Sequence, residues 1–374
     1  MKNLFILLLV GFTLLSNAQN RCGTAAHTLE MIEQYPDYAK AKAKVNTETE
    51  NWIANHPNYQ TKTIITIPVV VHVVWNTTAE NISDAQILSQ IEILNNDYRR
   101  TNIDAINTPN VWQGIAADCE IEFCLANTDP NGMSTTGIDR VNTTQTSFGM
   151  SGDPVMSVSS GGADPWNQDN YLNIWVCDLG SGLLGYASPP SSWPNPSDGV
   201  VIGYKYFGNT GTAQPPYHKG RTATHEVGHW LNLEHIWGAW GNCGNDQVAD
   251  TPIQEEENYS CPSYPHNANS CGTTNANGDM FMNYMDYTND ACMNFFTIGQ
   301  KNRMHSAINQ YRSDLLNHTL CEGGVSAITE NIKSTKKLIK IVDVLGRNIE
   351  INHFNTPLFY IYDNGSVEKR IIME

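Results

Sequence analysis

The pattern of apolar and polar positions divides the chain into a polar helical start, a centre of strands and helices, and a short alternating end. Residues 19 to about 60 are polar with helical spacing, and they lack the apolar content for a core of their own. We therefore expect them to dock on another part of the chain. Residues 64–75 differ, because the run ITIPVVVHVVW is rich in β-branched residues and predicts a buried strand.

The central region continues with an amphipathic helix and further strands. Apolar residues recur at helical spacing after Ser83, which is a suitable N-cap for that helix. Strands are predicted at 119–126 (CEIEFCLA) and 171–179 (YLNIWVCDL), with loops rich in glycine, serine and asparagine between them. With a long helix further along, this order predicts an α/β or α+β domain on a twisted sheet.

The chain changes character after Cys321. Residues 323–335 have the composition of a linker. Residues 336–374 contain short alternating strands separated by turn residues, which predicts a separate small β module.

Composition and the first residues indicate where the protein works. The formal net charge of the 374-residue chain is −16, which argues against nucleic acid because phosphate binding needs clustered lysine and arginine. Residues 1–18 have a positive start, an apolar run and small residues before a cut after Ala18, the pattern of a secretory signal peptide. No other segment is long and apolar enough to span a membrane. We expect a protein exported through the periplasm and secreted, with no integral membrane part.

The strongest chemical signal is HEVGHWLNLEH at residues 225–235. Residues four apart lie on one face of a helix, so His225 and His229 can grip one metal ion through their imidazole nitrogens. Glu226 lies beside the site and can take a proton from the attacking water. The pattern therefore predicts a hydrolytic zinc site.

The third ligand requires the helix to end early. At about 100° per residue, His235 would lie about 280° around the helix axis from His225 if the helix continued, and it would face away from the metal. The helix must therefore stop after about Leu231 for His235 to reach the metal. Asn232 is the residue that makes the turn, because asparagine follows glycine in its tolerance of left-handed backbone.

These residues resemble the metzincin metalloproteases, whose zinc motif is HExxHxxGxxH, with Asn232 in place of the glycine. NYMDY at 283–287 is similar to the methionine turn of that group, with Met285 as the methionine under the zinc ligands. Tyr287 matches a tyrosine that helps to bind zinc or the reaction oxyanion in related families. Residues 21–321 most resemble the pappalysin family, especially its small ulilysin-like members, through RCGT, IPVVVHVVW, YLNIWVCDL, GLLGYASPP, the zinc motif and NYMDY.

The resemblance implies the fold and the form in which the enzyme is made. It implies an upper subdomain with a twisted mixed sheet and the zinc helix, above an irregular, loop-rich lower subdomain with the methionine turn. Cys22, in RCGT, would cap the zinc and keep a precursor inactive until residues 19–61 are removed. Thiolates are good zinc ligands, and the odd total of nine cysteines fits one that forms no disulfide.

Further sites are implied by the same resemblance. It favours disulfides between Cys243 and Cys271 and between Cys261 and Cys292, while Cys119, Cys124, Cys177 and Cys321 stay unassigned. The loop GNDQVADTP matches a structural calcium site of the family, with ligands Asp246, Val248 (through its carbonyl) and Thr251. A solvated acidic loop is the alternative there.

The C-terminal module resembles sorting domains of the type IX secretion pathway, through KLIKIVDVLGR and PLFYIYDNGSVEKR. Its partner would be that secretion machinery. A β domain that binds substrate or a surface is the alternative. The expected organisation is a signal peptide at 1–18, a propeptide at 19–61, a catalytic domain at 62–322, a linker at 323–335 and the sorting module at 336–374.

We therefore predict a secreted zinc metalloendopeptidase that hydrolyses proteins or peptides and is expected to be monomeric. The substrate is expected to bind as an added strand along an edge of the sheet, and residues 182–190 are the candidate for that edge. One rival is a zinc hydrolase of another clan whose third ligand is Glu255 or Glu256. A second is a secreted binding or adhesion protein with a degenerate site, against which the intact motif argues. A third is a structural zinc site, which would need a fourth ligand from Cys22.

Overall fold

A computed structural model of the chain describes residues 21–57, 59, 61, 63–180, 182–193, 197–238, 241–271, 277–316, 318–321, 338–343, 347–348, 357–362 and 367–371. The expected signal peptide at 1–18 and linker at 323–335 lie outside these residues. Packing divides the chain into two units, one ending at Cys321 and the other beginning at Glu322, and each is described by itself.

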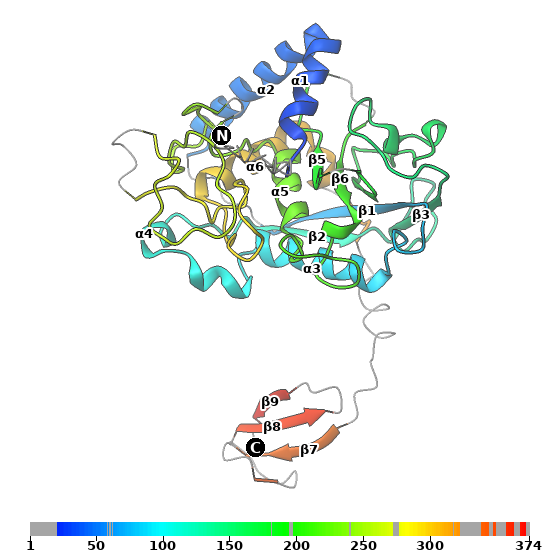
Figure 1. Cartoon of the computed structure of the whole chain (residues 1–374), viewed down its shortest axis with the longest axis vertical. Helices are drawn as coiled ribbons and strands as arrows, with labels where there is room; N and C mark the ends of the chain where they lie inside the picture. Colours follow the sequence, from blue (N-terminus) through cyan, green and yellow to red (C-terminus); the bar gives the residue numbers. More distant parts are fainter. Residues whose placement is uncertain are drawn as a thin grey trace, which may run out of the picture. The chain divides into compact units, whose positions relative to one another are not determined.

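The first unit contains both helices and strands, which Figure 1 labels in chain order. The α-helices are α1 (Thr24–Gln34), α2 (Pro36–Asn55), α3 (Asp84–Tyr98), α4 (Asn110–Gln113), α5 (Arg221–Trp230) and α6 (Ile298–Tyr311). The 3-10 turns are η1 (Ile103–Asn107), η2 (Pro154–Met156), η3 (Val158–Ser160), η4 (Tyr204–Tyr206) and η5 (Ser313–Leu316). The strands are β1 (Ile65–Trp75), β2 (Ile121–Leu125), β3 (Ile138–Asn142), β4 (Leu172–Cys177), β5 (Gly185–Ala187) and β6 (Val200–Gly203).

These strands form one mixed sheet around β1. The order is β2-β1-β4-β6-β5, and β3 also pairs with β1. All pairs are parallel except β5 with β6, so the antiparallel β5 closes one edge. The expected strands at 64–75, 119–126 and 171–179 are confirmed as β1, β2 and β4, and β5 lies within the expected sheet edge at 182–190, whereas β3 and β6 were not foreseen.

Side-chain alternation along β1 separates two cores. Ile67, Val69 and Val71 belong to the larger core, which includes apolar residues of α3 and α5. Val74, on the other face, packs in a smaller core with Trp175 and other residues. The expected cap is also confirmed, because the Ser83 hydroxyl accepts a hydrogen bond of 3.2 Å from the Gln86 backbone nitrogen.

The two N-terminal helices dock on the rest of the first unit, as their polar composition predicts. Helix α2 packs against α6, and α1 packs against α2 and β5. Only one face of α2 is buried, with Tyr38, Ala41, Val45 and Thr49 on it. Helices with so little apolar surface depend on that docking for their stability.

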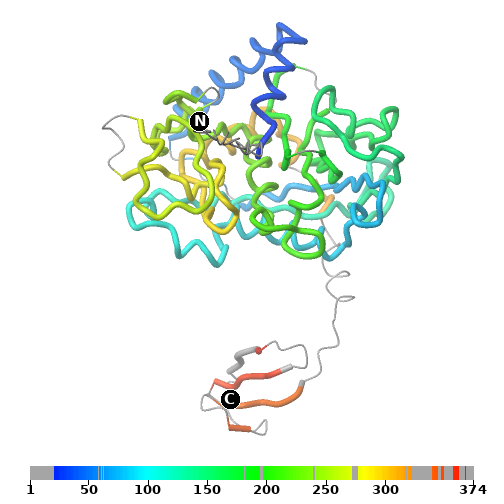
Figure 2. The backbone as a smooth tube through the Cα atoms, in the orientation of Figure 1, coloured from blue at the N-terminus to red at the C-terminus, as the bar shows by residue number. Residues whose placement is uncertain are grey.

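Between α5 and α6 the described residues 231–238, 241–271 and 277–297 include no helix or strand, and Figure 2 draws this stretch largely in yellow as loops. An upper layer of sheet and α5 thus adjoins an irregular lower part. This arrangement confirms the α+β, two-subdomain fold that the resemblance implied.

The second unit contains the antiparallel sheet β7 (Leu338–Val342), β8 (Pro357–Tyr362) and β9 (Val367–Ile371), in that order. Its small core consists of Ile341, Leu358 and Tyr360. Within the described parts of the chain, the helices are all too short or too polar to cross a membrane.

Candidate metal centre

Three histidines and one cysteine converge at the C-terminal part of α5. The Nε2 atoms of His225, His229 and His235 lie 3.0 to 3.2 Å from one another. Together with Cys22 Sγ, these atoms all lie within 4.8 Å of one another, and all four residues are buried. The sequence had singled out these four residues, and the structure places their side chains together.

The early end of α5 brings His235 to the other two. The helix ends at Trp230, and Asn232 has a φ of 72°, in the left-handed region, as its position in the motif predicts. The Leu233 backbone nitrogen then donates to the Gly228 carbonyl at 2.9 Å, which closes the helix end. Gly228 allows a close approach of Met285, because a β-carbon there would lie 2.7 Å from Sδ of that methionine and would displace it.

The tautomers of two histidines are fixed by backbone carbonyls. Nδ1 of His225 donates to the Tyr284 carbonyl at 2.7 Å, and Nδ1 of His229 donates to the Leu233 carbonyl at 2.8 Å. Their Nε2 atoms therefore carry lone pairs that point into the cluster. Burial lowers the pKa of His229 to about 4 and lowers the pKa values of His225 and His235 well below the ordinary value. Neutral imidazoles are the form that binds a metal.

This donor set fits zinc. Adjacent lone pairs repel one another unless a cation lies between them, and tetrahedral zinc with Zn–N of about 2.0–2.1 Å separates its nitrogens by roughly 3.3 Å. Burial also raises the pKa of the Cys22 thiol well above its ordinary value, so a cation is needed to hold a thiolate there. Two soft-to-borderline ligand types, imidazole and sulfur, at these separations favour zinc over calcium or magnesium.

Glu226 lies fully buried beside the cluster. Its Oε2 accepts hydrogen bonds from the Thr24 hydroxyl at 2.8 Å and from Cys22 Sγ at 3.4 Å. Its Oε1 has no hydrogen-bond partner among the described residues. Burial raises the pKa of Glu226 to about 8, so this carboxyl group can hold a proton near neutral pH.

Tyr287 and Met285 occupy the loop that faces α5. The Tyr287 ring contacts the rings of His235 and Trp237, and its hydroxyl donates to the Cys22 carbonyl at 3.3 Å. Met285 is fully buried, and its sulfur packs beneath Gly228. Its backbone nitrogen donates to Asn283 Oδ1 at 2.9 Å, which holds the turn.

The segment that contains Cys22 lies along the sheet edge β5. The Gly23 backbone nitrogen donates to the Gly185 carbonyl at 2.9 Å, and the Ala187 backbone nitrogen donates to the Thr24 hydroxyl at 2.8 Å. Residues 182–190 were the expected binding edge, and β5 is indeed an edge strand whose outer side accepts an extended segment.

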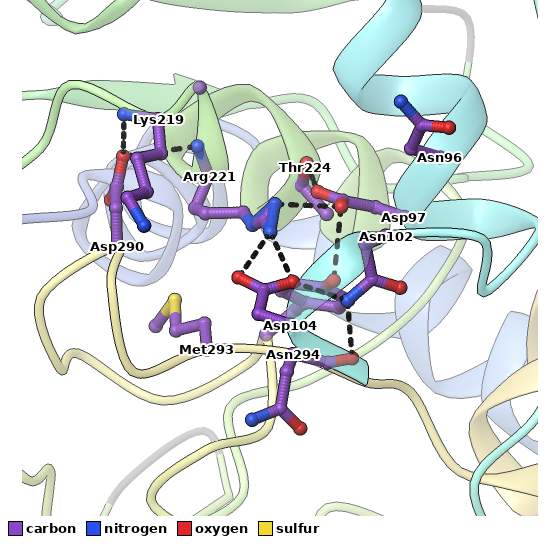
Figure 3. A network of polar contacts seen from close by, with 12 residues as sticks. Asn96, Asp97, Asn102, Asp104, Lys219, Arg221, Thr224, Asp290, Met293 and Asn294 are labelled. Atoms are coloured by element: carbon purple, nitrogen blue, oxygen red, sulfur yellow. Dashed lines mark hydrogen bonds and ion pairs between the residues drawn. The ribbon is translucent and has the colours of Figure 1, made fainter. Parts of the chain in front are cut away.

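Arg21 extends from this segment to Asp290, which the sequence did not single out. The Arg21 guanidinium forms an ion pair with Asp290 at 3.4 Å and donates to the Thr288 carbonyl. Asp290 also accepts hydrogen bonds from the backbone nitrogens of Lys219 at 2.8 Å and Arg221 at 3.2 Å (Figure 3). No spacing rule links residues so far apart, so sequence reasoning had no signal for this contact.

A second polar network supports the start of α5 and was also missed. Asp97 accepts hydrogen bonds from Arg221 Nη1 at 2.7 Å and from the Thr224 hydroxyl at 2.6 Å (Figure 3). Asp104 accepts from Arg221 Nη2 at 2.9 Å, and the Tyr284 hydroxyl donates to Asp97 at 3.0 Å. The network connects α3, α5 and the methionine-containing loop.

The three residues of the expected calcium loop do lie together. The Thr251 hydroxyl lies 2.8 Å from Asp246 Oδ2 and 2.9 Å from the Val248 carbonyl. Burial raises the pKa of Asp246 to about 7.

Glu255 and Glu256 are the candidate third zinc ligands of the rival hydrolase hypothesis. Both are exposed and are not part of the histidine–cysteine cluster.

The disulfides match the expectation and extend it. Bonds join Cys243 to Cys271 and Cys261 to Cys292, which confirms the implied pairing. A third bond joins Cys124 to Cys321. Among the described residues, Cys22, Cys119 and Cys177 are free and buried.

Comparison with known proteins identifies related metalloproteases. The sequence profile of the peptidase family described as pregnancy-associated plasma protein-A matches residues 159–309. An extracellular metalloprotease of Arthroderma benhamiae is 31% identical over 253 residues, which cover 67% of this chain and 79% of the relative. One of Colletotrichum graminicola is 30% identical over 309 residues, which cover 79% of this chain and 92% of the relative.

Solved structures give the same result. A mutant of promirolysin from Tannerella forsythia superposes with a TM-score of 0.71 at 49% identity, covering 79% of this chain and 97% of that chain. Mature mirolysin from the same organism, in complex with a cleaved peptide, has a TM-score of 0.64 at 52% identity and covers 69% of this chain and 100% of that one.

Proposed function

The chain is a metalloprotease of the pappalysin family, and from this premise we propose that it is a secreted zinc metalloendopeptidase, made as a zymogen, with Glu226 as general base. The observation that carries the proposal is the convergence of three neutral imidazoles beside the buried carboxyl group of Glu226.

His225, His229 and His235 would hold the ion through their Nε2 atoms. Zinc, when bound, lowers the pKa of a water molecule and polarises the carbonyl of the peptide bond to be cleaved. Glu226 takes a proton from that water as the water oxygen bonds to the carbonyl carbon, and it passes the proton to the leaving nitrogen as the C–N bond breaks. The position of Glu226, 3.4 Å from the sulfur of Cys22 in the cluster, and its partnerless Oε1 support this role.

Tyr287 supplies a hydrogen bond to the oxyanion that develops on the carbonyl oxygen. Its hydroxyl already lies in the cleft, where it donates to the Cys22 carbonyl at 3.3 Å. Burial raises the pKa of this phenol well above its ordinary value, so the hydroxyl keeps its proton for donation. Met285 and Asn232 have structural roles. Met285 packs under the ligands, and Asn232 forms the turn at the end of α5.

Residues 19–61 act as the inhibitory propeptide, with Cys22 as the ligand that blocks the metal. The contacts of Cys22 with Glu226 and of Gly23 with the edge strand β5 support this role. The segment fills the position in which a substrate would add a strand to β5, so it must leave before peptides can bind.

The remaining assignments concern stability and location. The cluster of Asp246, Val248 and Thr251 would bind a structural calcium ion, supported by its carboxylate and carbonyl oxygens. Both fungal relatives described above are named extracellular metalloproteases, which supports secretion. The C-terminal sheet would direct the monomeric protein through the type IX machinery.

Metal analysis paired with hydrolysis of a protein substrate tests the proposal. Wild type and Glu226→Ala are compared after incubation that allows maturation. We expect about one zinc per chain in both, with cleavage and removal of the N-terminal segment in wild type only. If the two proteins behave alike, the metal site is structural and a binding function replaces the peptidase.

A further inference from the structure

The third histidine of the cluster is held differently from the other two. His225 and His229 each donate from Nδ1 to a backbone carbonyl, at 2.7 and 2.8 Å. Among the described residues, the hydrogen-bond contacts of His235 all come from Nε2 and go to the other two histidines. A metal-binding histidine almost always uses its second nitrogen for an outer contact that fixes its ring. Another kind of contact must therefore orient His235.

Trp237 provides a flat surface for that ring. The imidazole of His235 and the indole of Trp237 are nearly parallel, with 7° between their planes and 4.5 Å between their centroids. This separation is at the close end of the range for stacked aromatic pairs. A backbone turn keeps the two residues together, because the Gly238 nitrogen donates to the His235 carbonyl at 2.8 Å. The indole is buried and therefore offers a fixed face.

Tyr287 lies edge-on to both rings. Its centroid lies 5.0 Å from that of His235, with 85° between the planes, and 4.9 Å from that of Trp237, with 84°. The indole and the phenol thus contact the imidazole from two perpendicular directions. Rotation of the imidazole about its Cβ–Cγ bond would lose the parallel contact and press the ring against its neighbours. These contacts therefore fix the plane of His235.

We propose that Trp237 is a positioning residue that holds the His235 ring, by stacking, in the orientation that metal binding requires. Backbone carbonyls have this role for the other two histidines. The inference rests on the proposed zinc site and concerns how this chain builds its third ligand.

The proposal has a consequence for zinc affinity. Metal binding withdraws electrons from an imidazole, and an electron-poor ring stacks more strongly on the electron-rich face of an indole. A contact that is stronger in the zinc-loaded protein than in the metal-free protein raises zinc affinity by the same factor. A tryptophan that only fills space stabilises both forms alike and leaves the affinity unchanged.

Zinc affinity is measured by competition with a chelator on the full-length chain that carries Glu226→Ala, so that no variant loses its N-terminal segment by self-cleavage. We expect Trp237→Leu to weaken zinc binding by about tenfold, the usual effect of losing a group that orients a ligand. Trp237→Phe keeps an aromatic face and should stay within about threefold of the parent chain. Trp237→Met, which also lacks a ring, replaces Trp237→Leu if that variant does not fold.

Trp112→Leu is the matched control. Trp112 is 7% exposed and Trp237 is 6% exposed, but Trp112 packs in the larger core and is not part of the histidine–cysteine cluster. We expect Trp112→Leu to lower the Tm of the metal-free protein and to keep the zinc affinity of the parent chain. Zinc binding that Trp237→Leu leaves unchanged, or that both substitutions weaken equally, overturns the proposal.

Cobalt in place of zinc reports the geometry of the ligands. Its visible absorption bands depend on how the ligands are arranged around the ion. Trp237→Leu should change the position or intensity of these bands, whereas Trp237→Phe and Trp112→Leu should keep the spectrum of the parent chain. A spectrum that Trp237→Leu leaves unchanged shows that the indole does not position His235.

Metal binding separates this inference from the peptidase proposal. If the chain with intact Glu226 binds zinc but cleaves no protein, the peptidase proposal fails, and the affinities and spectra still decide the role of Trp237. If that chain cleaves protein while Trp237→Leu keeps the parent affinity and spectrum, only the role of Trp237 is rejected. A chain that binds no zinc overturns both.

Discussion

The carbonyl oxygen of Tyr284 accepts a hydrogen bond of 2.7 Å from Nδ1 of His225, while the hydroxyl of the same tyrosine donates to Asp97 at 3.0 Å. One residue thus orients a histidine of the proposed metal site through its backbone and contacts a buried carboxylate through its side chain. Asp97 is in turn bonded to Arg221 and Thr224 at the start of α5. The position of His225 therefore depends on groups that never touch the metal.

This network makes the effect of Asp97→Asn predictable. The substitution removes one of the two carboxylates that neutralise the buried Arg221, so we expect the free energy of unfolding to fall by about 2–3 kcal/mol. Tyr284→Phe, which removes only one hydroxyl, should cost about 1 kcal/mol. Urea unfolding of wild type and the two variants gives both values. If the two variants lose the same free energy of unfolding, the negative charge of Asp97 does not contribute to stability.

Removal of the metal should destabilise the protein. Three imidazole nitrogens meet in one buried site, so an ion present at about 1,000 times its dissociation constant would add about 4 kcal/mol. We expect a zinc chelator to lower the Tm of wild type and to have no effect on His235→Ala, which should contain little zinc. Glu256→Gln is the control for the rival third ligand and should keep both its zinc and its response to the chelator.

Tyr287→Phe should separate chemistry from metal binding. If its hydroxyl stabilises the oxyanion, kcat of the matured enzyme falls by about a hundredfold, the usual effect of removing one such donor. Zinc content should stay the same, because three histidines hold the ion. Steady-state kinetics with metal analysis checks this, and a variant that loses zinc together with activity would instead make Tyr287 a ligand.

Asn232 allows a matched pair of substitutions. At a φ of 72°, alanine is strained by about 1–2 kcal/mol, whereas glycine is not. Both substitutions lose the 3.0 Å hydrogen bond from the Asn232 amide to the Thr49 hydroxyl of α2. We therefore expect the free energy of unfolding of Asn232→Ala to be about 1–2 kcal/mol lower than that of Asn232→Gly. Its melting temperature should be lower accordingly. Equal melting temperatures would mean that the turn relaxes away from the left-handed conformation.

A pH dependence is expected from a pair far from the metal. His72 is buried in β1, and its Nδ1 lies 3.1 Å from Asp139 Oδ2. This hydrogen bond lowers the pKa of Asp139 below its ordinary value of 3.8. A depressed carboxyl pKa adds stability above the unfolded-state value and loses it as the pH falls through the folded-state value.

The stability difference between wild type and Asp139→Asn should therefore be largest above pH 5 and should shrink as the pH falls toward 3. Denaturant unfolding at several pH values measures it. Asp314→Asn, which changes an exposed aspartate, should show no such trend. A difference that stays constant would show that the carboxylate charge contributes nothing.

Local rules were sufficient for part of the fold and of the site. β1 could be predicted because its β-branched run is long, and the end of α5 could be placed because ligand geometry and the backbone tolerance of Asn232 agree. β5 and β6 have three and four residues, too few for any periodicity to be recognised. β3 has the mostly polar sequence IDRVN, so no apolar pattern in the sequence indicated a strand there.

Contacts between distant segments explain the rest. The ion pairs of Asp290 with Arg21, of Asp97 with Arg221 and of Glu234 with Lys42 join residues that lie far apart in the sequence. A charged residue within a loop or at the end of a helix is ordinarily read as a solvated group. Only the folded chain reveals that these carboxylates are paired in buried positions.

The bond between Cys124 and Cys321 has a mechanical consequence. It closes a loop with a sequence separation of 197, and every metal-binding histidine lies within that loop. When the chain is stretched from its two ends, tension passes through the disulfide and leaves the enclosed segment slack. Helices α1 to α4 and the strand β1 all precede Cys124, lie outside the loop and carry the load. A pull that strips Cys22 from the edge strand β5 would therefore leave the segment between the two cysteines, which contains the three clustered histidines, unextended.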